Sequence, residues 1–183
     1  MRTRTSRLLA PLAVALALLS ACTSPTEPDP FGEPPPGTYQ SALVAVVGTG
    51  EGGTSVTPVA HASGIFAGTM RFRVRAKPNT TYKVQRAADV NKPGNDDGVC
   101  QRAEGAAPWS PADGPAFVQF PIPFTGPLVV MTTDSKGEGT LDYPYESPQI
   151  PRGYRFDVRM RLVDDENAPT SDLRSGCMTI EVL

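Results

Sequence analysis

The feature that most constrains this fold is strict alternation of apolar and polar residues in two stretches, residues 66–75 and 154–162. A period of two residues is that of a β-strand with one buried face and one face toward solvent. Such alternation favours antiparallel sheets. The side expected to face solvent carries six arginines: Arg71, Arg73, Arg75, Arg155, Arg159 and Arg161.

Shorter segments extend this pattern along the chain. We expect further strands at 81–86, 117–120, 128–132, 139–143 and 178–182. The continuously apolar stretch Ala42–Val47 predicts a strand that is buried on both faces. The 20 prolines and 17 glycines fall in short clusters, and no stretch has a helical period. The sequence therefore predicts an all-β domain over residues 39–183, an antiparallel two-sheet β-sandwich of about nine strands.

One glycine-rich segment matches the letters of a nucleotide-binding motif. Residues 48–53 satisfy G-x-G-x-x-G and follow an apolar strand. Dinucleotide binding also needs a helix that opens at the last glycine and an acid about 20 residues later. Here Thr54–Pro58 is β-branched and ends in proline, and residues 68–75 contain no acid. We therefore expect a glycine loop between strands, and no cofactor.

The N-terminal segment has the layout of a secretory signal peptide. Three arginines within the first seven residues precede an apolar run over residues 8–19, and the small residues Ser20 and Ala21 precede Cys22. The run is too short to cross a membrane as a helix, which needs about 20 residues.

The residues Leu19-Ser20-Ala21-Cys22 resemble the lipobox of bacterial lipoproteins. This resemblance implies that residues 1–21 are removed and that Cys22 becomes an acylated N-terminus, held by several acyl chains at the bacterial membrane. Thr23 stands where an aspartate would favour the inner membrane, so the outer membrane is favoured. The alternative is an ordinary secreted protein.

With Cys22 acylated, Cys100 and Cys177 remain, and an exported chain most simply pairs them. Two free thiols are the alternative. Residues 22–38 hold the expected lipidated cysteine and six prolines, which predicts an extended tether.

A second resemblance concerns the domain itself. The pattern Thr133-Asp134-x-x-Gly137-x-Gly139, followed by Gly153-Tyr154-x-Phe156, is similar to the late hairpin of bacterial immunoglobulin-like extracytoplasmic domains. It covers about 30 residues and supports the fold class, not an activity.

Metal and catalytic signals are weak. His61 is the only histidine, and neither H-E-x-x-H nor G-x-S-x-G occurs, so we expect a loop residue rather than a catalytic base. Residues 89–98 form an oxygen-rich loop in which Pro93 occupies a position where a Ca²⁺ ligand belongs. A solvated turn is therefore favoured over a calcium site, and the run 164–167 is interpreted in the same way. The weak calcium ligands are Asp89, Asn91, Asn95 and Asp97.

Two features suggest binding. The six arginines are either paired with local acids on the sheet or form a basic patch for anionic envelope material, such as phosphorylated lipid headgroups or acidic glycan. Trp109, in a proline-flanked loop, either stacks on a sugar or caps the sandwich. The net charge of −2 gives no reason to expect nucleic acid.

These observations favour a lipid-anchored binding or structural module of the cell envelope, without enzymatic activity, that contacts the membrane through its lipid and binds an envelope protein or anionic glycan. One alternative is a carbohydrate-binding accessory lipoprotein that uses Trp109, Tyr143 and Tyr145. A third class is a hydrolase built from the carboxylates Asp134, Glu138 and Asp142.

Overall fold

The computed structural model describes residues 35–89, 98–100, 117–121 and 126–183, and these residues form ten strands and no helix. This confirms the all-β class. None of the described residues belongs to a helix that could cross a membrane. The strands are β1 (Tyr39–Val47), β2 (Glu51–Val59), β3 (Ile65–Arg75), β4 (Thr81–Asp89), β5 (Val118–Gln119), β6 (Val130–Thr132), β7 (Glu138–Pro151), β8 (Arg155–Val163), β9 (Asp172–Ser175) and β10 (Met178–Glu181).

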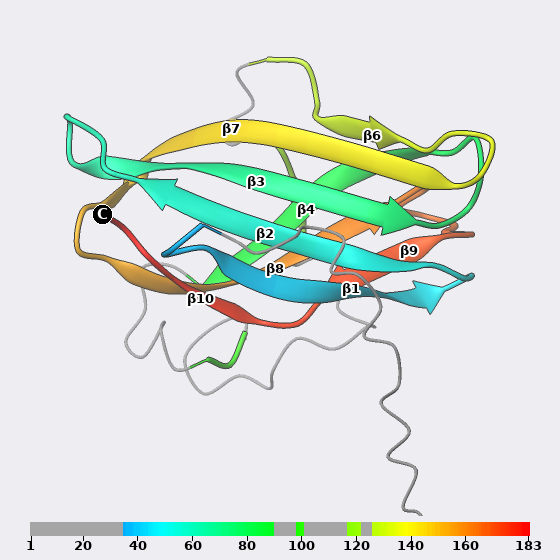
Figure 1. Ribbon diagram of the computed structural model, residues 1–183, viewed down its shortest axis with the longest axis horizontal. Coiled ribbons are helices and arrows are strands. Elements are labelled where there is room, and N and C mark those ends of the chain that lie inside the picture. Colours follow the sequence, from blue (N-terminus) through cyan, green and yellow to red (C-terminus); the bar gives the residue numbers. More distant parts are fainter. Residues whose placement is uncertain (1–34, 90–97, 101–116, 122–125) are drawn as a thin grey trace, which may run out of the picture.

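The strands pair antiparallel in one sheet that curls over on itself (Figure 1). Their order is β5-β4-β8-β9-β1-β2-β3-β7, with β10 added to β8 and β6 added to β4. Figure 1 shows β1, β2, β3 and β7 side by side, crossing in front of β4 and β8. Because β1 pairs with β9, the front and back strands share one hydrogen-bonded sheet. The expected division into two separate sheets is therefore not confirmed.

One apolar core fills the space that the curled sheet encloses. Leu43 and Phe72 enter it from the front strands, Tyr82 and Leu162 enter it from the back, and all four are 0 % exposed. Burial of each such side chain stabilises the fold by about 1.5–3 kcal/mol. The inner side chains of β3 and β8 are those that the alternation predicts: Phe66, Met70, Phe72 and Val74, and Phe156, Val158, Met160 and Leu162.

The glycine motif forms the hairpin between β1 and β2. Gly48 has φ 73°, a left-handed conformation that glycine adopts without a steric penalty. The chain then pairs Glu51 with Val44 and continues as a strand. The predicted glycine loop is therefore confirmed.

Strand β1 differs from the prediction in its burial. Leu43 is fully buried, but Val44 is 56 % exposed, and Ala42 is exposed as well. The prediction that this strand is buried on both faces is therefore wrong. Within Ala42–Val47 the outer side chains are small and apolar, so the sequence shows an unbroken apolar run although only one face joins the core.

The disulfide lies on the outside of the sheet. Cys100 and Cys177 are bonded, with their Cα atoms 5.6 Å apart, which confirms the predicted pair. They pack with Ala87 and Phe117 in a small second cluster. The outer face of β4 and β8, expected to face water, is thus covered at this point.

Candidate functional site

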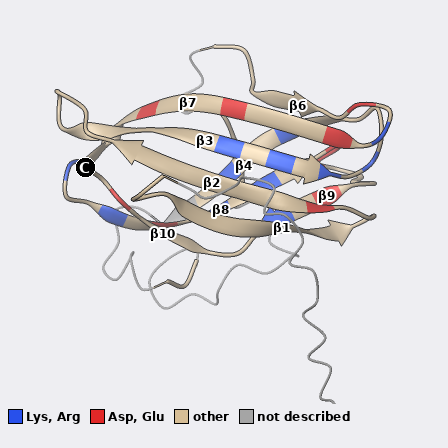
Figure 2. Cartoon of the chain, in the orientation of Figure 1, with Lys and Arg blue, Asp and Glu red and all other residues tan. Residues whose placement is uncertain are grey.

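The arginines of β3 lie beside an acidic strand. Register places Arg71 opposite Asp142 and Arg75 opposite Glu138 on β7. Arg73 Nη2 lies 2.6 Å from Asp142 Oδ1, and Arg75 Nη2 lies 3.2 Å from Glu138 Oε1. Figure 2 shows the basic bands of β3 next to the acidic bands of β7. The guanidiniums are therefore matched by carboxylates on the neighbouring strand, which lowers the affinity of this face for an external anion.

The arginines of β8 belong to a different part of the sheet. β3 pairs with β2 and β7, whereas β8 pairs with β4, β9 and β10, so the six arginines do not line two neighbouring strands. Arg155 is exposed and Arg159 is half-buried. Arg161 is only 4 % exposed, and Asp157, which shares its face of the strand, is 0 % exposed. The prediction that this side of β8 faces solvent is wrong for these two residues, because the segment with Phe117 and Cys100 packs over it.

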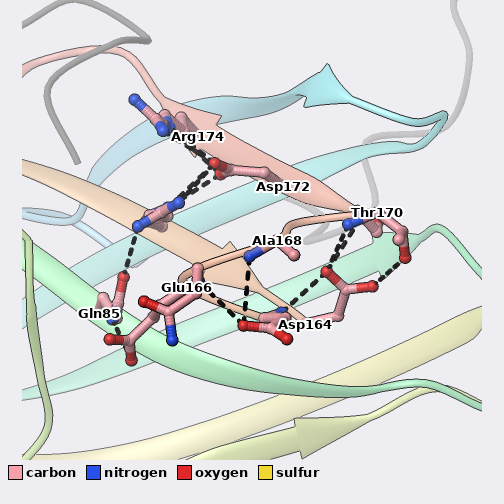
Figure 3. A network of polar contacts seen from close by, with 11 residues as sticks. Gln85, Asp164, Glu166, Ala168, Thr170, Asp172 and Arg174 are labelled. Carbon is pink, nitrogen blue, oxygen red and sulfur yellow. Dashed lines mark hydrogen bonds and ion pairs between the residues drawn. The ribbon is translucent and has the colours of Figure 1, made fainter.

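Arg161 takes part in a buried ionic network with Asp172 and Arg174 (Figure 3). The Asp172 carboxylate accepts hydrogen bonds from Arg161 Nη2 at 2.7 Å and from Arg174 Nη2 at 2.8 Å. Both guanidiniums lie over the ring of Phe117, at 5.3 and 5.1 Å from its centre. Burial alone raises the pKa of Asp172, but the hydrogen bonds from Arg174 and Arg161 outweigh it and hold the pKa below its ordinary value. This network holds β8 against β9.

The acidic run 164–167 caps its own loop. Asp164 accepts hydrogen bonds from the backbone N–H groups of Asp165, Thr170 and Ser171 and from the Thr170 hydroxyl. Burial opposes ionisation, but the hydrogen bonds from Thr170 and Ser171 keep the pKa of Asp164 far below its ordinary value. Figure 3 shows the Asp164 carboxylate turned toward Thr170. In the part of the chain that the structure describes, no cluster of three metal-ligating side chains occurs.

The three carboxylates considered for hydrolysis each have a structural partner. Asp134 Oδ1 accepts hydrogen bonds from the N–H groups of Glu138 and Lys136, which lowers the pKa of Asp134. Glu138 pairs with Arg75, and Asp142 pairs with Arg73. His61 lies between β2 and β3, where its Nδ1 accepts a hydrogen bond from the Ser63 N–H, as expected of a loop residue.

An aromatic cluster lies where β5 and β7 approach each other. The Phe120 ring lies 5.1 Å from Tyr145 and 5.8 Å from Tyr143, and Tyr145 lies 6.3 Å from Phe66. Tyr143 and Tyr145 stack on each other, and Tyr145 is 7 % exposed. Burial and the neighbouring Tyr145 raise the pKa of Tyr143. We name these rings, with Phe156, the aromatic seam.

A cavity opens beside the aromatic seam, and one of its walls is an arginine. Its other lining side chains are apolar or aromatic, among them Phe66, Met70, Tyr145 and Met160. A groove of about 780 Å³, which shares Tyr145 with this cavity, is lined by Ile65, Tyr143 and Glu146 among others. The cavity itself has room for about one water molecule, about 20 Å³. Arg86 reaches it because this residue pairs with Met160 of β8 and so shares the inner face of the sheet.

Sequence reasoning missed Arg86, although a signal was present. Tyr82 and Val84 of the strand predicted over 81–86 lie in the core, and a period of two residues places Arg86 on the same side. It also missed Asp172, which lies in β9 and not in a loop. The predictions for Cys22, Trp109, Asn91, Asn95 and Asp97 lie outside the described residues, and Asp89 is the last residue of β4.

Comparison of the chain with known protein families, with curated protein sequences and with solved structures finds no match.

Proposed function

We propose that this chain is a non-enzymatic binding module of the bacterial cell envelope, anchored by lipid at Cys22. In this proposal residues 1–21 are a removed signal peptide, residues 22–38 a tether and residues 39–183 a β-sandwich that works as two layers, as in immunoglobulin-like domains. The outer membrane is the favoured location. The groove beside Tyr143 and Tyr145 is the binding region.

The observation that carries the proposal is a contrast between charged groups. Most charged side chains of the described sheet have partners within the fold: Arg73 with Asp142, Arg75 with Glu138, and Arg161 with Asp172. Such groups support the fold and have little left to offer a ligand. The groove beside Tyr143 and Tyr145 instead combines an open mouth, an apolar lining and a few polar atoms, which is the usual composition of a ligand site.

The carbohydrate-binding alternative loses support from two of its residues. A sugar stacks on an exposed ring face. Tyr145 is 7 % exposed, and it stacks on Tyr143. That alternative now depends on Trp109.

Crosslinking in intact envelopes tests the proposal. The native chain and a Cys22→Ala variant are expressed at equal levels, crosslinked, and captured by a C-terminal tag. We expect the native chain to fractionate with the membrane and to capture a reproducible envelope component. We expect the Cys22→Ala variant to leave the membrane fraction and to lose that component. Equal fractionation of the two chains contradicts the lipid anchor.

A further inference from the structure

Among the described residues of β7, one acid has no arginine opposite it. Glu138 and Asp142 lie opposite arginines of β3, whereas Glu146 lies opposite Ala67. Figure 2 shows that the acidic bands of β7 extend beyond the basic bands of β3. Within the described residues, the ion-pair neighbour of Glu146 is His61, which is charged only when protonated and whose Nε2 lies 3.7 Å from Oε1. The Glu146 side chain is 63 % exposed, so its carboxylate is open to a cation from outside the chain.

This carboxylate lies at the groove beside Tyr143 and Tyr145. In the described part of the chain, Glu146 is the single charged side chain that lines the groove. The walls include Val59, which is 51 % exposed, and three prolines. The groove thus combines an apolar surface with one negative charge, and the complementary ligand is a cation on an apolar body.

The prolines limit how a protein segment can dock in this groove. β7 is the last strand in the order of the sheet, and proline in a sheet occurs at such an edge, with its nitrogen turned to solvent. Pro144 and Pro148 therefore leave gaps in the row of N–H groups that this edge would offer to an added strand. Grooves lined by aromatic rings instead receive proline-rich segments, which already favour the extended polyproline conformation before they bind.

The spacing of the groove matches such a segment. Val59 of β2, Ala67 of β3 and Glu146 of β7 lie in one row across three paired strands. Neighbouring strands are about 4.8 Å apart, so Val59 and Glu146 are about 10 Å apart. A polyproline segment rises about 3.1 Å per residue, so about three residues separate a proline on Val59 from a cation on Glu146.

We infer that the groove binds a proline-rich segment of an envelope protein, with a lysine or arginine of that segment on Glu146 and its prolines against the apolar walls. This inference rests on the proposed binding function and deepens it by naming the chemistry of the partner. An acidic glycan, the other class of ligand expected from the sequence, would meet a carboxylate here and, among the described lining residues, no cation.

NMR titration of the full chain carrying Cys22→Ala, which has no acyl group of its own, tests this inference. The first probe is a capped peptide with one lysine between two Pro-Pro-Pro triplets. We expect it to shift the backbone amides of Ala67 and Glu146, and to leave that of Asp172, in the buried network between β8 and β9, unmoved. The same peptide with glutamate in place of lysine should bind about fivefold more weakly. A third peptide, with glycine in place of every proline, and trigalacturonate should cause no shift.

Charge reversal on both sides gives the sharpest comparison. We expect Glu146→Lys to weaken the binding of the lysine peptide about fivefold and to strengthen that of the glutamate peptide by about the same factor. Glu138→Lys is the matched control. Glu138 lies on the same strand and its side chain is 51 % exposed, but it does not line the groove. This variant should bind the lysine peptide as the native residue does.

Equal binding of the lysine and glutamate peptides, shifts at the groove caused by trigalacturonate, or no shift with any probe would each overturn the inference. An unchanged preference for lysine in Glu146→Lys would overturn it as well. The comparison of the two peptides on the chain with native Glu146 stands even if a variant fails to fold. If the peptides do not bind but crosslinking in intact envelopes still captures a component, this inference fails and the proposed function stands.

Discussion

Replacing Asp172 by asparagine is the perturbation whose outcome the structure defines most sharply. Asp172 is 0 % exposed and is the carboxylate between two guanidiniums, those of Arg161 and Arg174, which are 4 % and 6 % exposed. It accepts hydrogen bonds from the Nε and Nη2 atoms of both. The substitution Asp172→Asn preserves the size of the side chain but removes the negative charge.

The magnitude follows from burial. Removing one partner of a buried ionic network leaves uncompensated charge and costs about 3–5 kcal/mol. That is a large fraction of the roughly 5–15 kcal/mol that stabilises an ordinary domain. For a chain of this length we expect the melting temperature to fall by about 10 °C.

Asp142→Asn is the matched control. Asp142 also lies between two arginines, Arg71 at 3.9 Å and Arg73 at 2.6 Å, but its side chain is 49 % exposed. The same substitution there should cost no more than about 1 kcal/mol, because water screens exposed pairs. Urea unfolding of both variants, followed by circular dichroism with the disulfide intact, gives the two free energies. If Asp172→Asn costs no more than Asp142→Asn, the reasoning from burial is refuted.

Three further predictions concern the rest of the fold. Cys177→Ser should lower the free energy of unfolding by about 4–5 kcal/mol, because the loop of 77 residues is no longer closed in the unfolded chain; an unchanged urea midpoint would contradict this. Because the pKa of Asp172 is lower in the folded state, the ionised carboxylate stabilises the fold above the ordinary aspartate pKa of 3.8, and this stabilisation is lost as pH falls below it. Free energies of unfolding measured from pH 6 to pH 2 should therefore decline less steeply in Asp172→Asn than in the native chain. Gly137→Ala should cost about 1–3 kcal/mol, since φ is 84° and a Cβ would meet the Ala76 carbonyl oxygen at 2.1 Å. Gly126→Ala is the control and should be neutral, because the described residues place no atom within 4 Å of that Cβ. Thermal melts of the two variants measure the difference.

The parts of the fold that could be predicted are those in which local pattern and tertiary burial agree. β3 and β8 alternate cleanly because one face of each packs into the core, and their inner residues were identified from the sequence. The disulfide was predictable because two cysteines were left once Cys22 was set aside. Both predictions use information that lies in the order of residue types alone.

Two strands were missed because their composition resembles that of loops. β2 is rich in glycine, serine and threonine and contains Pro58, which normally interrupts a sheet. Pro58 is accommodated because β1 pairs with β2 only as far as Val56, so no residue of β1 pairs with β2 at position 58. β9 consists largely of polar residues that are buried, and Asp172 is stabilised there by partners that include Arg161 of the neighbouring strand.

The candidate site was the least predictable part. An arginine at the end of a predicted strand suggests solvent, and Arg86 was not singled out. The alternation of β4 predicts that Arg86 points inward. Which side chains surround Arg86 there depends on the residues that β7, β8 and the segment of β5 contribute, and the sequence of β4 alone does not show them. Four of the arginines that did attract attention are paired with acids of neighbouring strands, which a single strand does not reveal: Arg71, Arg73, Arg75 and Arg161.

The central claim is that the arginines of β3 are matched by carboxylates of β7 and support the fold instead of binding a ligand. Crosslinking in intact envelopes, with the native chain compared with Arg71→Met, tests it most directly. The claim predicts that both chains capture the same component at the same yield. Loss of that component in Arg71→Met, with an unchanged melting temperature, would contradict it.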